Sequence, residues 1–358
     1  MLVLILYVVI LLVELVLILS FQFRFKKNPV DQIVSTPVSV LVCARNEEEN
    51  LRRCLNSLIR SNYDLSQVEI LVGDDHSTDR TPEIIAQFMH EYPSIRSIKI
   101  DDRKEGLIAK GNVLAQLVAH AQYEKILIID ADMKVADSWL MTMSQLLEQH
   151  DMVSGFTMID KDYHRPQMQF FDWATVLHSM KAMADLWQPI SILGNNMGFT
   201  KRAYDQVGGF KALGPTDVED LGLLRVFQKA GLTSFQYLGK EGKAYTKAQQ
   251  GWRAMLEQRC RWMNGVFTHY WLLAIPAFFA RLWMPVFLLC FAFGFWFSPY
   301  ILIYGLLFPT IKYLQVTARA NHKYKLLFSS PAIISVLDTF ALIRTLVFGK
   351  VSWKGRKF

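Results

Sequence analysis

Two kinds of hydrophobic pattern divide this chain. Unbroken apolar runs occupy both ends, whereas residues 35–258 alternate short β-branched runs with stretches of helical spacing. Short runs of this kind are typical of buried strands, and the helical spacing is typical of amphipathic helices. The pattern predicts strands at 38–43, 68–73, 95–100 and 125–129, and helices at 47–61, 82–92, 107–121, 170–187 and 223–229. Strand–helix alternation favours an α/β fold with a mostly parallel sheet, in which ligands bind at the carboxyl ends of the strands.

The first apolar run, residues 2–19, is just long enough to cross the roughly 30 Å hydrocarbon layer as a helix. A cleaved signal peptide is the alternative interpretation. No basic residue precedes the run, and Arg24, Lys26 and Lys27 follow it. This order favours an uncleaved N-terminal transmembrane anchor over 1–22, with the following domain in the cytoplasm.

Apolar character returns at 266–280, 283–309 and 331–348. Asp338 and Arg344 interrupt the last run, which is typical of an amphipathic helix lying on the membrane surface. We therefore expect C-terminal membrane and interfacial helices over 263–349, with two crossings, and a basic cytoplasmic tail over 350–358. The chain is predicted to be a multi-pass protein of the cell (plasma or inner) membrane.

Composition narrows the class of protein further. Hydrophobic residues make up 52% of the chain and charged residues 20%, which excludes a disordered chain. The net charge of +7 suits an anionic partner such as a phosphorylated substrate or an acidic membrane surface. Much of the basic charge flanks apolar segments, so nucleic acid is not expected as a partner. The four cysteines lack metal-binding spacing and are expected to be free thiols.

Polar motifs follow the first two predicted strands. After the first strand come Ala44, Arg45, Asn46 and Glu47. This turn can meet a ligand with side chains and free N–H groups, or it can cap the next helix through Asn46. Asp74 and Asp75 follow the second strand, where they can bind a ligand or stabilise a turn.

Asp130 and Asp132 stand directly after the strongly apolar strand at 125–129. Ionised carboxylates at such a place are costly without a partner. Hard divalent cations, Mg²⁺ or Mn²⁺, bind a few carboxylates together with phosphate oxygens. The pair therefore favours a ligand site.

Two further motifs are ambiguous by themselves. Glu219 and Asp220 precede a predicted helix, where they complement its dipole or supply a general base. Gln258, Arg261 and Trp262 stand at the junction with the membrane block. They can bind a diphosphate and a sugar, or form an interfacial basic-aromatic belt.

Taken in order, these motifs resemble those of the membrane-bound family 2 glycosyltransferases. That group includes cellulose, hyaluronan and poly-N-acetylglucosamine synthases and ceramide glucosyltransferase. The resemblance rests on D-D-x-S-T-D, D-x-D, E-D and Q-x-x-R-W and extends from about residue 37 to residue 262. It implies a GT-A fold over 35–262, a nucleotide-activated sugar, usually UDP-linked, and inversion at the anomeric carbon. His76 and Val218 depart from the common motifs but remove no ionisable group.

The resemblance also assigns roles to individual residues. It implies that Asp220 is the catalytic base with Glu219 beside it, and that Asp132 binds the cofactor, Mg²⁺ or Mn²⁺. The acceptor-side loop would contain Asn195, Asn196 and Gly198. The nucleotide sugar would be bound by Ala44, Arg45, Asn46, Glu47, Asp74, Asp75, Lys110, Asp130, Gln258, Arg261 and Trp262.

The predicted activity is inverting, metal-dependent transfer of a sugar from a nucleotide sugar to a membrane lipid or lipid-linked glycan. Few membrane helices leave little material for a polymer channel, which favours a single transfer. A processive polysaccharide synthase is the alternative, with a partner subunit or an oligomer supplying the channel. Intact Asp75, Asp132, Asp220 and Arg261 disfavour an inactive nucleotide-sugar sensor. A dinucleotide dehydrogenase is disfavoured because no G-x-G-x-x-G follows the first strand.

Overall fold

The computed structural model of the chain describes residues 35–101, 107–160, 166–214, 216, 218–264 and 330–348, the backbone of 352–353 and 356–357, and a few isolated positions. The anchor predicted over 1–22 and most of the region 263–329 lie outside these residues. The described chain forms two compact units. One contains Lys26–Met158 and Met183–Lys247, and the other contains Ile159–Ala182 and Ala248–Phe358.

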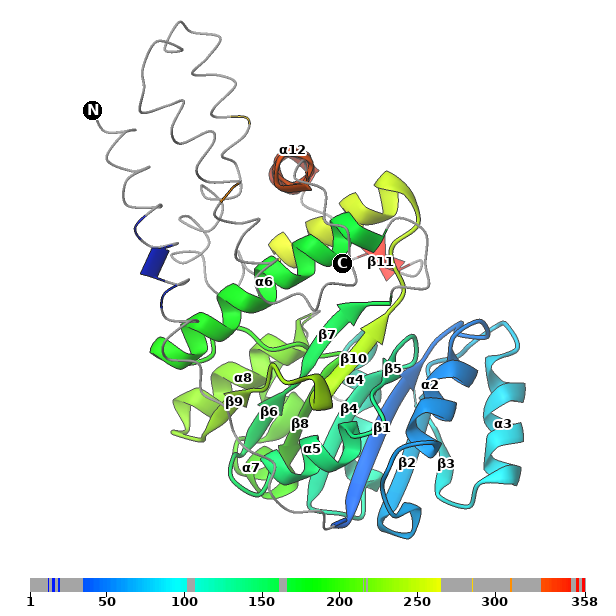
Figure 1. The fold of residues 1–358 in the computed structure, drawn as a ribbon. Helices are drawn as coiled ribbons and strands as arrows, with labels where there is room; N and C mark the ends of the chain where they lie inside the picture. The colour runs from blue at the N-terminus through cyan, green and yellow to red at the C-terminus, as the bar shows by residue number, and fades with distance from the viewer. Residues whose placement is uncertain are drawn as a thin grey trace, which may run out of the picture. The chain divides into compact units, whose positions relative to one another are not determined.

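A seven-stranded sheet lies at the centre of the first unit (Figure 1), in the order β3-β2-β1-β4-β8-β6-β9. Its strands are β1 (Val38–Ala44), β2 (Val68–Asp74), β3 (Ile95–Lys99), β4 (Lys125–Asp130), β6 (Met152–Ser154), β8 (Asn196–Thr200) and β9 (Ser234–Gln236). The pairs from β3 to β4 and the pair β6–β9 are parallel, whereas β8 is antiparallel to both neighbours. The predicted α/β fold with a mostly parallel sheet is confirmed.

The four predicted strands lie within one residue of their observed bounds at each end. The segment interpreted as an acceptor-side loop differs, because Asn196 and Gly198 belong to β8. A smaller sheet joins β5 (Lys134–Val135), β10 (Lys243–Thr246) and β7 (Phe156–Ile159).

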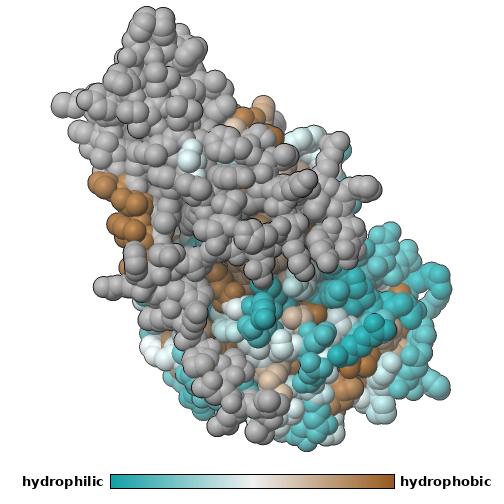
Figure 2. All heavy atoms as spheres, viewed as in Figure 1, coloured by the Kyte–Doolittle hydropathy of each residue, from teal (hydrophilic) through white to brown (hydrophobic). Residues whose placement is uncertain are grey.

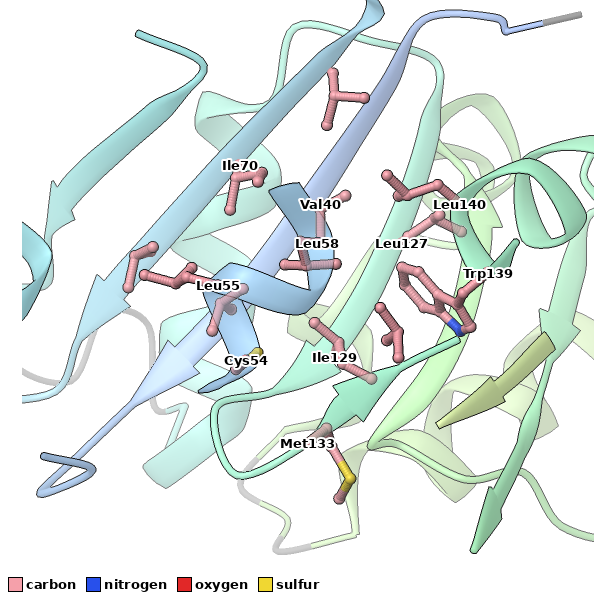
Figure 3. Packing of buried hydrophobic residues seen from close by; sticks show 14 of the residues in the cluster. Val40, Cys54, Leu55, Leu58, Ile70, Leu127, Ile129, Met133, Trp139 and Leu140 are labelled. Atoms are coloured by element: carbon pink, nitrogen blue, oxygen red, sulfur yellow. The ribbon is translucent and has the colours of Figure 1, made fainter. Parts of the chain in front are cut away.

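One face of the large sheet carries the main core (Figure 3). Alternate residues of a strand point to opposite faces, and Val40 and Ile70 point toward Leu55 and Leu58 of α2 (Leu51–Ile59). The same core includes buried residues of α3 (Thr81–Glu91) and α5 (Trp139–Leu146). The opposite face of β2 packs against α4 (Ala109–His120). Apolar burial on both faces explains why these strands have nearly continuous hydrophobic sequences.

For three of the helices, the observed start agrees with the sequence prediction in one case and differs from it in two. Pro82 lies in the first turn of α3, as predicted. The helix predicted from residue 47 begins only at Leu51, because Asn46 has a φ of 52° and residues 48–50 form a turn. The helix predicted at 223–229 begins earlier, as α8 (Glu219–Lys229), so both acids lie in its first turn. The short helix α7 (Lys201–Gln206) follows β8.

The second unit is helical in its described part. It contains most of α6 (Pro166–Leu186), a helix at 251–264 and α12 (Ser330–Phe348). Among the described residues, α12 supplies the one stretch long and apolar enough to cross a membrane. Its Asp338 and Ala341 are fully buried, whereas Phe340 and Ile343 are 60% and 53% exposed. Apolar residues of α12 at the surface are brown in Figure 2.

Substituting Gly198 by alanine should destabilise the first unit, since β8 passes closely over β4. A Cβ at this position would lie 2.5 Å from Leu127 Cδ2 and 2.7 Å from the Ile126 carbonyl oxygen. Overpacking of this kind costs about 1–3 kcal/mol, so the midpoint of thermal unfolding should fall. Gly111→Ala is the matched control, because its Cβ would meet Glu219 Cβ at 3.7 Å, an ordinary contact. Equal midpoints for the two variants would contradict the prediction.

Candidate active site

Strand register brings the polar motifs to one edge of the sheet. Cys43 in β1 is opposite Gly73 in β2 and Asp130 in β4. The carboxyl ends of three parallel strands therefore lie side by side, with Asp75 and Arg45 just beyond two of them. This is the edge at which ligands bind in open parallel sheets.

Arg45 and Asp75 form one connected structure at this edge. The Asp75 N–H donates to the Ala44 carbonyl oxygen at 2.8 Å. Arg45 Nη1 donates to the Asp75 carbonyl oxygen at 2.6 Å and lies 3.6 Å from its carboxylate. Both side chains are mostly buried, so the ends of β1 and β2 are held in a fixed relation.

Asn46 links the loop after β1 to the loop after β2, whereas Asp74 stabilises its own loop. Asp74 Oδ1 accepts hydrogen bonds from the Ser77 hydroxyl at 2.5 Å and from the Ser77 N–H at 3.1 Å. Asn46 Oδ1 accepts from the Thr78 N–H at 2.8 Å. Asn46 therefore does not cap the helix that follows it, and the alternative interpretation of Asn46 as a helix cap is wrong.

Glu47 is buried beneath these loops. Its N–H donates to Thr81 Oγ1 at 2.8 Å, and its carboxylate accepts from Asn50 Nδ2 at 2.6 Å. These two contacts hold the turn into α2 and the start of α3.

Lys110 lies among the carboxylates of Asp130, Glu219 and Asp220 at this edge of the sheet. Lys110, in the first turn of α4, places Nζ 2.6 Å from Asp130 Oδ1 and 3.6 Å from Glu219 Oε1. Its Nζ also donates to the Gly194 carbonyl oxygen at 3.0 Å. Ala109, just before it, has a φ of 46°, a strained value for a residue other than glycine. Lys110 thus bridges β4, α8 and the loop before β8.

Burial and charge act in opposite directions on these groups. Burial by itself would lower the pKa of Lys110, but the Asp130 and Glu219 carboxylates outweigh it and raise that pKa. Burial raises the pKa of Glu219 to about 7, opposed by Lys110 and reinforced by Asp220. Burial also raises the pKa of Asp220, again opposed by Lys110. Perturbed carboxylates around one lysine are typical of functional sites.

Backbone N–H groups hold the carboxylate of Asp220. Oδ1 accepts from the Leu221 N–H at 2.7 Å, and Oδ2 accepts from the Gly194 N–H at 2.8 Å. The first turn of α8 offers such N–H groups because they have no partner within the helix. Hydrogen bonds to the carboxylate favour its ionised form, as a general base requires.

The residues predicted for the acceptor side differ from one another. Asn196 is fully buried, and its side chain bonds Trp139 Nε1 at 2.8 Å and the Gly242 carbonyl oxygen at 3.2 Å. Gly198 is packed against β4. Asn195 is half-buried and accepts from Thr157 Oγ1 at 3.0 Å. Asn195 is therefore the one of the three that is partly exposed to solvent.

Asp132 follows β4 by two residues and is half-buried. No group of three or more His, Cys, Asp or Glu side chains arranged for a metal ion occurs among the described residues. Mg²⁺ commonly uses one or two carboxylates and completes its octahedron with phosphate oxygens and water. The oxygen donors at the end of β4 fit this pattern of binding.

Gln258, Arg261 and Trp262 lie on the helix at 251–264 in the second unit. The Trp262 ring packs edge-on against Trp173 of α6, with centroids 5.2 Å apart. Burial lowers the pKa of Arg261, opposed by Glu257. The order of the motifs along the chain therefore does not place all the predicted residues in one compact unit.

A buried charge cluster in the same unit was not predicted. Arg259 Nη2 lies 2.5 Å from Asp172 Oδ2 of α6, and Arg259 Nε lies 3.1 Å from Asp338 Oδ1 of α12. All three side chains are at most 3% exposed. The available signal was the presence of Asp172 and Asp338 within otherwise apolar runs, since such charges need partners.

The chain is similar in sequence to known proteins. A sequence model described as Glycosyl transferase family 21 matches residues 2–358. The β-monoglucosyldiacylglycerol synthase of Nostoc sp. is 27% identical over 242 residues, covering 65% of this chain and 49% of that protein. The poly-β-1,6-N-acetyl-D-glucosamine synthase of Staphylococcus epidermidis is 23% identical over 201 residues, covering 52% and 47%. The chain spans about half the length of these curated relatives.

Among solved structures, the mannosyltransferase PcManGT from Pyrobaculum calidifontis, in complex with GDP-Man and Mn²⁺, is similar to this chain. The TM-score is 0.61 at 18% identity, covering 96% of this chain and 99% of that one. At this identity the likeness concerns the fold. It supports the GT-A-like α/β architecture expected from the motifs.

The Glu219→Gln variant should alter how stability depends on pH. The folded state raises the pKa of the Glu219 carboxyl from 4.5 to about 7. Its contribution to stability is therefore complete below about pH 4.5 and is lost as pH rises through about 7. The thermal midpoint of the wild type should fall relative to that of Glu219→Gln across this window. The exposed Glu91→Gln is the control, and parallel curves for wild type and Glu219→Gln would contradict the assignment.

Proposed function

The chain belongs to glycosyl transferase family 21, and from this membership we propose that it transfers a sugar from a nucleotide sugar to a membrane lipid. The observation that carries the proposal is the arrangement around Lys110. The mostly buried Lys110 ammonium contacts the Asp130 carboxylate, and the same ammonium is connected through the backbone of Gly194 to Asp220. The Lys110 ammonium, on the side proposed for the donor, and the Asp220 carboxylate, the candidate base, thus lie at the same edge of the sheet.

The proposed reaction follows from these positions. Asp220 accepts the proton of an acceptor hydroxyl, whose oxygen forms a bond to the anomeric carbon of the donor. The bond from that carbon to the diphosphate oxygen breaks, and the nucleoside diphosphate leaves with the electron pair. One base without a covalent enzyme intermediate gives inversion, and the expected transition state is oxocarbenium-like by analogy with glycoside hydrolysis.

The nucleotide-sugar donor is expected to bind across the ends of β1, β2 and β4. In this proposal Arg45 and Asp75 contact the nucleoside, while Lys110 offsets negative charge on the diphosphate. Mg²⁺ or Mn²⁺, held by Asp132, would supply further compensation of that charge. Fixed cations in a partly water-excluded site act more strongly than they would in bulk water.

A lipid acceptor is favoured by the relatives and by α12. The Nostoc relative is named as a glucosyldiacylglycerol synthase. In α12, Val336, Phe340, Ile343 and Val347 recur at spacings of three and four, and each is at least 37% exposed. A helix with one face buried in protein and an exposed apolar stripe on the other suits the membrane interface. We propose that α12 lies in the interface of a cell membrane, with the catalytic domain in the cytoplasm.

The alternative is processive synthesis, supported by the relative named poly-β-1,6-N-acetyl-D-glucosamine synthase. A processive enzyme would give a ladder of products on one acceptor, with a partner subunit or an oligomer forming the channel. A lipid-modifying enzyme would add one sugar or a defined few. Mass spectrometry of the lipid products separates the two functions.

Transfer should depend on Asp220. Purified full-length protein in lipid nanodiscs is expected to release nucleoside diphosphate from one donor of a UDP- and GDP-sugar panel, with Mg²⁺ or Mn²⁺ present. Asp220→Asn should reduce the rate by about 10²-fold or more, because the general base is lost, while donor affinity changes little. Asp205→Asn, on the exposed surface of α7, is the control. Activity retained by Asp220→Asn would remove the assignment of the base.

The depth of α12 in the bilayer gives a separate test. Val336 and Val347 are eleven residues apart, which is about 16 Å along a helix. Single cysteines at 336, 340, 343 and 347 carry an environment-sensitive fluorophore, in protein whose native cysteines are replaced by alanine. Spin-labelled lipids should quench all four to a similar, shallow depth. A steady change of depth from 336 to 347 would indicate a spanning helix instead, and no quenching at any position would exclude membrane contact of this face.

A further inference from the structure

Gly194 connects the two chemically active sides of the cluster. Its carbonyl oxygen accepts a hydrogen bond from Lys110 Nζ at 3.0 Å, and its N–H donates to Asp220 Oδ2 at 2.8 Å. A single residue therefore contacts both the Lys110 ammonium and the proposed base. Neither contact uses a side chain of Gly194, so sequence motifs for charged or polar residues do not indicate this role.

The position has no space for a side chain. A Cβ at 194 would lie 2.7 Å from Asp220 Oδ2 and 2.9 Å from Asp220 Cβ, closer than real Cβ contacts. Gly194 is not among the described glycines with positive φ, so its backbone conformation does not demand glycine. The requirement for glycine comes from the close approach of Asp220.

The loop around Gly194 is held on both sides. The Leu193 N–H donates to Ser154 Oγ at 3.3 Å, and Asn195 Oδ1 accepts from Thr157 Oγ1 at 3.0 Å. The next residue, Asn196, is fully buried in β8. A side chain added at 194 would therefore displace the carboxylate of α8 more readily than it would displace the loop.

We propose that Gly194 is the residue that positions Asp220 for proton abstraction, setting the base at a fixed distance from the lysine on the donor side. The inference rests on the proposed function, and it goes beyond that function by assigning the position of the base to the backbone of a residue outside the recognised motifs. Displacement of a catalytic group by about 1 Å can reduce a rate by about 10²-fold.

The test compares Gly194→Ala with Gly111→Ala in full-length protein in nanodiscs. Gly111 is a matched control at the same edge, where a Cβ would make only an ordinary contact with Glu219. Gly194→Ala should lower kcat by about 10²-fold, with the KM for the donor within about threefold of the wild type. The Gly194 N–H also lowers the pKa of Asp220, so the acidic limb of the kcat–pH profile should move to higher pH in Gly194→Ala.

Hydrogen exchange gives a readout that does not require turnover. In Asp220→Ala the Gly194 amide loses its acceptor and should exchange faster than in the wild type, whereas unchanged exchange would overturn the tether. A Gly194→Ala variant with wild-type kcat and pH profile would overturn the positioning role while leaving the transferase proposal intact. If the wild type transfers no sugar from any donor, both proposals are overturned. The failure of the transferase proposal can therefore be told apart from the failure of the positioning role alone.

Discussion

The ion pairs of Lys110 constrain the rest of the active-site edge. The carboxylates of Asp130, Glu219 and Asp220 lie close to Lys110, and burial together with the neighbouring negative charges raises the pKa of Glu219 and of Asp220. The Lys110 ammonium lies 2.6 Å from Asp130 and 3.6 Å from Glu219, and its positive charge opposes the rise in the pKa of Glu219 and Asp220. The Lys110 ammonium belongs to α4, whereas the oxygen atoms that it contacts belong to β4, to α8 and to the loop before β8. The cluster therefore exists only when all these elements have packed.

In the second unit, too, one cation lies between acidic side chains from different elements. Arg259 lies between Asp172 and Asp338, so one guanidinium connects the helix at 251–264 to α6 and α12. A buried ion pair adds little net stability compared with apolar packing, but loss of one member leaves an uncompensated charge. Arg259 stands inside the Q-x-x-R-W motif, between Gln258 and Arg261. Its contacts thus fix the orientation of the helix that presents those side chains.

Several residues predicted to bind substrate contribute to architecture. Asn196 is buried between Trp139 and the Gly242 carbonyl, and Asp74 bonds Ser77 within its own loop. Conversely, Gly194 has no reactive side chain yet touches both Lys110 and Asp220. Side-chain chemistry read from sequence identifies candidate residues, but burial and hydrogen-bond partners decide which ones face a ligand. A sequence motif cannot indicate which backbone groups contact the site, because almost every residue carries the same N–H and carbonyl groups.

The sequence by itself determined the α/β class, the four parallel strands and the placement of Asp75, Asp130 and Asp132 after strand ends. These features depend on local periodicity, which strands and amphipathic helices express within a few residues. It also predicted that Glu219 and Asp220 stand at a helix N-terminus. Only the tertiary structure decided that β8 is an antiparallel strand, that Lys110 pairs with Asp130 and that Arg259 joins Asp172 to Asp338. Those contacts join residues about 20 to 90 positions apart, and their energy arises from burial and geometry that exist only after the chain has packed.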